Sequence, residues 1–193
     1  MNSVKKNSEI ILASEEEFAY AVAKGVLEPP KLSIWMILIP IIIVFFMYRH
    51  QKYVDGRKSF VKNFLVSRKL AIDAAVDAIQ SGQKANVARA VGKANVPEDT
   101  RKDYAAWIRL LIEHYEHLLR GKSDAYDAMI KSAYKTRSNY LQYLSRLNNA
   151  EKQFNAVLKP HLHTTAKDVD EIIVRMESWS DKIRRAEAQR VFS

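Results

Sequence analysis

The segment Glu113-His114-Tyr115-Glu116-His117 holds the side chains of this sequence best suited to metal chemistry. Residues three or four apart share a helix face, so His114 could pair with His117, or Glu113 with His117, around one ion. Carboxylate-bridged metal centres in helical bundles also need paired Glu-x-x-His motifs and further glutamates on facing helices. This chain has no second copy of the cluster, so we expect no metal and no other cofactor, and Glu113, His114 and His117 are weak candidate ligands.

Enzymatic chemistry is not expected either. The sequence has no nucleophile elbow, no Gly-rich phosphate loop and no His-Glu-x-x-His motif. The absence of cysteine excludes disulfides and thiolate metal sites. A metal-dependent helical-bundle enzyme is therefore the least favoured interpretation.

The sequence pI near 9.6 raises the question of nucleic-acid binding. Three tyrosines lie among cations in a pattern that could stack on bases: Tyr134, Tyr140 and Tyr143, with Lys135, Arg137 and Arg146. Helix packing uses the same residue types more often, and the chain contains no recognised reader motif. We do not expect a nucleic-acid partner.

An uncharged stretch of seventeen residues runs from Leu32 to Tyr48 (LSIWMILIPIIIVFFMY), between Lys31 and Arg49. As a helix it would span roughly 25 Å, close to the lower limit for crossing a bilayer core of about 30 Å. Eleven of its side chains are Leu, Ile, Val or Phe, which favour insertion into a bilayer, so we predict a transmembrane segment at 32–48 and hence a single-pass membrane protein.

Two residues of the stretch bear on its course through the membrane. Trp35 and Tyr48 fit aromatic belts at two interfaces, which favours a full span. Pro40 lies at the centre, where it removes a helix hydrogen bond and allows a kink. A re-entrant hairpin that leaves both chain ends in the cytosol is therefore the alternative topology.

The basic excess of the chain is concentrated directly after the apolar stretch, in 49–69. Seven cations face one acid, Asp55, in this region: Arg49, Lys52, Arg57, Lys58, Lys62, Arg68 and Lys69. Basic flanks stay on the cytosolic side during insertion, so we expect the N-terminus outside and the C-terminal domain in the cytosol. The same cations are candidates for contact with anionic lipid head groups.

Only five Gly and five Pro interrupt the 193 residues, which favours long helices. Ser14 and Glu17 form a capping box that predicts a short helix up to Gly25. Apolar spacing, caps and prolines predict the remaining helices at 59–80, 83–95, 97–120, 123–158 and 165–191.

The predicted architecture is all-α, an antiparallel bundle with a long helical hairpin, in part a coiled coil. Its regions are an N-terminal tail (1–31), the membrane segment (32–48), a basic juxtamembrane region (49–69) and the bundle (70–193). Arg137 and Glu151 interrupt the apolar seam, where polar groups fix register, mark a partner surface or lie at the edge of the stripe. With Tyr140 and Tyr143 they are our candidates for partner binding.

These features together predict a membrane-anchored, non-enzymatic scaffold or accessory subunit whose cytosolic bundle binds another protein. The apolar stretch lacks the small residues of close helix dimers, so any homo-oligomer would form through the helical domain. The alternative is a membrane-surface protein that acts on anionic lipid through region 49–69.

Overall fold

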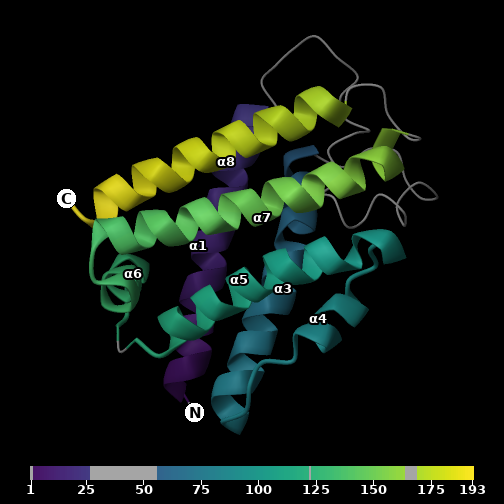
Figure 1. The fold of residues 1–193 in the computed structure, drawn as a ribbon. Coiled ribbons are helices and arrows are strands. Elements are labelled where there is room, and N and C mark those ends of the chain that lie inside the picture. The colour runs from purple at the N-terminus through teal and green to yellow at the C-terminus, as the bar shows by residue number, and fades with distance from the viewer. Residues whose placement is uncertain (1, 27–55, 122, 164–168) are drawn as a thin grey trace.

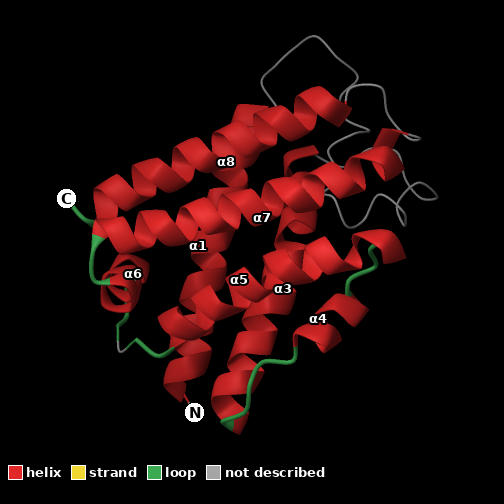
Figure 2. Ribbon diagram, in the orientation of Figure 1, coloured by secondary structure: helices red, strands yellow, loops and turns green. Residues whose placement is uncertain are grey.

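The computed structural model describes residues 2–26, 56–121, 123–163 and 169–193. Within these ranges the protein contains helices and no strand, which confirms the predicted all-α class (Figure 2). The elements in chain order are α1 (Asn2–Val26), α3 (Gly56–Ser81), α4 (Val87–Lys93), a 3-10 turn η2 (Glu98–Thr100), α5 (Arg101–Leu119), α6 (Tyr126–Tyr134), α7 (Arg137–His163) and α8 (Val169–Val191).

Five long helices close a ring around the core. The helix α1 packs against α3 and α8, α3 packs against α5, α5 packs against α7, and α7 packs against α8. In Figure 1, α7 and α8 lie side by side at one level, and α1 and α3 cross behind them. The short helices α4 and α6 cover the outside, so the predicted helical bundle is confirmed.

The helix α5 illustrates how the apolar pattern builds this ring. Its buried residues recur at spacings of three and four, which places them on one face. The five most buried lie at 0–1% exposure: Tyr104, Ile108, Leu111, Tyr115 and Leu118. The predicted helix at 97–120 is thus present, with the turn η2 preceding the α-helix.

The helix α1 is much longer than the predicted element at 14–25. It begins at Asn2, and Ser14 lies inside it rather than at its N-cap, so that prediction was wrong. The physical reason is packing, because Ile11 is fully buried against the bundle and Asn7 donates a 2.9 Å hydrogen bond to the Gly121 carbonyl. Tertiary contacts of this kind stabilise turns that local signals leave marginal.

The prediction of one helix over 123–158 was also wrong. The helix α6 ends at Tyr134, and Lys135 adopts a φ of 63°. The Asn139 side chain then donates a 3.0 Å hydrogen bond to the Tyr134 carbonyl, which fixes the corner. The following helix, α7, continues through Pro160 to His163 instead of ending there.

The helices α7 and α8 form the predicted long hairpin as antiparallel neighbours. Hydrogen bonds join Tyr140 to Glu187 and Asn155 to Glu177, so residue numbers rise on one helix as they fall on the other. Because α7 also packs on α5 and α8 on α1, the hairpin is part of the ring. The N-cap predicted at Thr165 lies outside the described residues.

The apolar stretch 32–48, with Leu32, Trp35, Pro40 and Tyr48, also lies outside the described residues. Among the helices that are described, none combines the length and the apolar character that a bilayer crossing requires.

Candidate functional site

Each of the five ring helices contributes one polar side chain to a cluster at the centre of the ring. We call it the ionic centre, and its members are Glu15 (α1), Arg68 (α3), Tyr115 (α5), Glu151 (α7) and Arg184 (α8). Four of them are charged, two of each sign, and their side chains are between 2% and 11% exposed.

The contacts of the ionic centre alternate in charge along a chain. Arg68 Nε donates to Glu15 Oε2 at 2.6 Å, and the Tyr115 hydroxyl donates to the other Glu15 oxygen at 2.7 Å. Arg68 Nη2 lies 3.8 Å from Glu151 Oε1, and Arg184 Nη1 donates to Glu151 Oε2 at 2.7 Å. Every charge of the centre therefore faces an opposite charge.

These charges hold helices together and are poorly suited to acid–base chemistry. Burial raises the pKa of Glu151, but Arg184 and Arg68 outweigh it and leave that pKa below its ordinary value. Burial lowers the pKa of Arg184, but the negative charge of Glu151 outweighs burial and leaves that pKa above its ordinary value. A general base needs a pKa near the working pH, whereas Glu151 and Arg184 stay charged at neutral pH.

A small cavity borders the ionic centre. Its volume is about 40 Å³, and Ser14, Phe18 and Leu144 are among the residues that line it. Pockets for organic ligands usually measure about 300–1,000 Å³. By comparison, this cavity has room for a few water molecules at most.

His114 lies beside this cavity, in a cluster of tyrosines. Its Nδ1 is 2.7 Å from the Tyr134 hydroxyl, and its ring stacks on Tyr143 at 4.6 Å between centroids. Burial lowers the pKa of His114 to about 3, with smaller contributions from His117 and Arg184. The imidazole is therefore neutral at physiological pH.

The other two candidate metal ligands lie elsewhere. Glu113 and His117 are exposed, whereas the imidazole of His114 is buried. Among the residues that the structure describes, no group of three or more His, Cys, Asp or Glu side chains could hold a metal ion.

The structure separates the predicted partner-binding residues. Only Arg137 is exposed, whereas Tyr140, Tyr143 and Glu151 are buried. Glu151 belongs to the ionic centre, and the tyrosines of the aromatic–cationic pattern pack around His114. In this fold these three residues contact other helices of the same chain rather than a surface.

The predicted head-group contacts divide in a similar way. Lys58, Lys62 and Lys69 are exposed, but Arg68 is buried in the ionic centre, so its assignment to lipid was wrong. The spacing of the three lysines, four and seven residues, places them on one outer face of α3. Of the remaining cations, Arg49 and Lys52 lie outside the described residues, and the side chain of Arg57 is not described.

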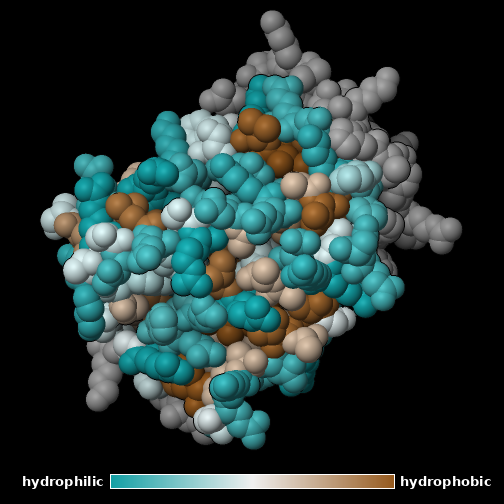
Figure 3. All heavy atoms as spheres, in the orientation of Figure 1, coloured by the Kyte–Doolittle hydropathy of each residue, from teal (hydrophilic) through white to brown (hydrophobic). Residues whose placement is uncertain are grey.

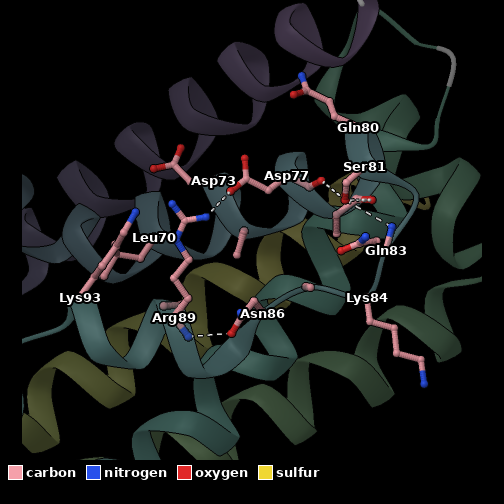
Figure 4. A pocket seen from close by; sticks show the side chains of 14 residues that line it. Leu70, Asp73, Asp77, Gln80, Ser81, Gln83, Lys84, Asn86, Arg89 and Lys93 are labelled. Carbon is pink, nitrogen blue, oxygen red and sulfur yellow. Dashed lines mark hydrogen bonds and ion pairs between the residues drawn. The ribbon is translucent and has the colours of Figure 1, made fainter.

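A groove of about 570 Å³ lies between the end of α3 and α4 (Figure 4). Its floor includes small apolar residues such as Ala74, Ala78 and Ala90. Asp77 on α3 and Arg89 on α4 form an ion pair across it at 3.6 Å, with both side chains about two-thirds exposed. No local sequence pattern predicts this groove, because α4 is short and its register on α3 follows from tertiary contacts.

Figure 3 shows that hydrophilic residues cover most of the visible face, with apolar residues gathered over α5 and α4. The fold and site thus define an all-α bundle that has a buried ionic centre and an open groove between α3 and α4. Neither protein-family models, nor curated proteins, nor solved structures give a significant match to this chain.

Proposed function

We propose that this protein is a membrane-attached, non-enzymatic scaffold or accessory subunit that binds another protein through its helical bundle. The observation that carries the proposal is the groove between α3 and α4, which is open, whereas the cavity at the ionic centre is too small for an organic substrate. The apolar stretch 32–48 supplies the attachment.

The groove has the properties of a site for a helix of a partner protein. Alanines on its floor allow close approach of another backbone, as small residues do at helix contacts. Its rims carry opposite signs, with Asp73 and Asp77 on α3 facing Arg89 and Lys93 on α4. An exposed ion pair such as Asp77–Arg89 contributes only about 0–1 kcal/mol, so a partner could replace it at little cost.

The test is co-purification of the full-length protein from its native membranes in mild detergent. A tryptophan at Ala74 would fill the groove, and we expect Ala74→Trp to lose a partner that the unchanged protein retains in stoichiometric amount. Ala106→Trp on the exposed side of α5 is the matched control and should retain it. Recovery of the lone chain in several detergents would contradict the proposal, as would equal retention by both variants.

A second candidate function, direct action on anionic lipid, is favoured by the exposed lysine face of α3. Full-length protein would be mixed with vesicles of neutral lipid, with and without phosphatidylserine. If the lysine face binds head groups, changing Lys58, Lys62 and Lys69 to Glu should abolish the salt-sensitive preference for phosphatidylserine. The same change at exposed Lys102, Lys131 and Lys152 alters net charge equally and should leave most of that preference.

A further inference from the structure

The packing of α1 constrains how the protein meets the membrane, because α1 precedes the apolar stretch and the other helices follow it. This inference rests on the proposed membrane attachment. The helix α1 is an integral member of the ring, since Ile11, Ala19, Val22 and Ala23 have no exposed surface. Its carboxylate in the ionic centre, Glu15, is a direct partner of Arg68 on α3.

A close approach between α1 and α8 adds to this evidence. Near the end of α1, a Cβ atom at Gly25 would overlap the indole ring of Trp179 on α8. The backbone of α1 therefore lies directly on that ring, a fit that leaves no room for even one methyl group. Contacts of this kind require α1 and α8 to fold in the same compartment.

The two ends of segment 27–55 also leave the bundle at the same place. The helices α1 and α3 are antiparallel, because Glu15 pairs with Arg68 and Phe18 contacts Phe64 with ring centroids 5.8 Å apart. The last residue of α1, Val26, shares an apolar cluster with Phe60 in the first turns of α3. Figure 1 shows the end of α1 and the start of α3 at the same side of the bundle.

Chain length then excludes a single crossing. After the stretch 32–48, only the seven residues 49–55 precede α3. Fully extended, they reach roughly 25 Å, which is less than the bilayer core of about 30 Å. They include Arg49, Lys52 and Asp55, whose charges oppose any position within hydrocarbon.

We propose that the protein attaches to the membrane from one side only, so that α1 and the helices that follow the apolar stretch lie in the same compartment, with the end of α1 and the start of α3 facing the lipid head groups. Exposed Lys24, Lys58 and Lys62 lie near this end of the bundle, where they suit anionic head groups.

The absence of cysteine from the chain makes the test direct. Single cysteines would replace two exposed residues in the full-length protein, Ala13 on α1 and Ser178 on α8. Each variant would be treated with a membrane-impermeant maleimide in sealed right-side-out vesicles and in sealed inverted vesicles, and labelling would be compared with that after detergent. We expect both positions to react only in the inverted vesicles, which expose the cytosolic face, and to equal extents.

One-sided attachment would be overturned if Ala13→Cys reacted mainly from one side of the membrane and Ser178→Cys mainly from the other, each with a preference of roughly tenfold or more. The scaffold proposal would then still stand. An alkaline wash of the same membranes separates the two ideas. Release of the protein into the supernatant would overturn membrane attachment itself, and the proposed function with it.

Discussion

The ionic centre allows a prediction about stability whose size follows from the contacts of Arg184. This guanidinium is 5% exposed and donates to Glu151 at 2.7 Å. The change Arg184→Met keeps an unbranched side chain of similar length but removes the charge. Glu151 would then retain only Arg68, at 3.8 Å, inside the bundle.

Breaking a buried ion pair by removal of one partner typically costs about 3–5 kcal/mol, because the remaining charge stays buried without compensation. For a chain of this size, each kcal/mol lowers the melting temperature by about 2–4 °C. We therefore expect Arg184→Met to lower it by roughly 6–20 °C. The assay is thermal unfolding of the detergent-solubilised protein, followed by circular dichroism at the helix band.

Two further variants distinguish the loss of charge pairing from a general packing defect. The double variant Glu151→Gln/Arg184→Met has no unpaired charge and should be more stable than Arg184→Met alone by about 1 kcal/mol or more. Arg190→Met, also on α8, breaks a pair with Asp127 whose side chains are 61% and 39% exposed, and should cost less than about 1 kcal/mol. Equal losses in Arg184→Met and Arg190→Met would refute the reasoning, and so would a double variant less stable than Arg184→Met.

Three further predictions concern titration and packing. Burial raises the pKa of Glu187 to about 7, so between about pH 4.5 and 7 the folded protein keeps a proton that the unfolded chain has lost. The wild-type protein therefore loses stability as the pH rises through this range. Glu187→Gln has no such proton, so in urea titrations it should gain stability relative to wild type over the same range. Burial holds the pKa of His114 near 3, so as the pH falls below about 6.5 the unfolded chain takes up a proton before the folded protein does. The wild-type protein loses stability as a result, and His114→Phe should gain stability relative to it between pH 6.5 and 4 in the same titrations. Gly25→Ala should destabilise the protein by about 1–3 kcal/mol in thermal melts because of the overlap with Trp179, whereas Gly92→Ala, with open space around it, should stabilise it by up to about 1 kcal/mol. Parallel changes in the two glycine variants would contradict the packing argument.

The helical class and most helix positions could be predicted from the sequence because apolar spacing reports which face of a helix is buried. The elements that were wrong are those that tertiary contacts decide. Nothing local requires a corner at Lys135, where the side chain of Asn139 closes the turn on the Tyr134 carbonyl. The first two turns of α1 likewise depend on contacts with distant partners such as Gly121.

The ionic centre was missed although its pattern is present in the sequence. Each of its four charges occupies a position of the apolar stripe of its helix. Arg68, for example, lies four residues after Phe64 and three before Ala71, both of which are buried. Arg68 was grouped with the other six cations of 49–69 as one basic region, and its assignment to lipid rested on charge alone. A charge within an apolar stripe predicts burial, but the identity of its partner depends on which helices become neighbours.

The ionic centre also explains why α1 can occupy only one position in the ring. A slide of α1 by one turn, about 5.4 Å, would keep much of its apolar face in contact with α3, since small residues such as Ala19 and Ala23 tolerate such shifts. The same slide would move Glu15 away from Arg68 and from the Tyr115 hydroxyl. The Arg68 side chain, which is 2% exposed, would then have Glu151 as its only acidic partner, at the longer distance of 3.8 Å. The loss of a buried partner, at about 3–5 kcal/mol, exceeds what a slid apolar contact could recover. The charges thus select the register of α1, and this register holds the end of α1 and the start of α3 at the same side of the bundle.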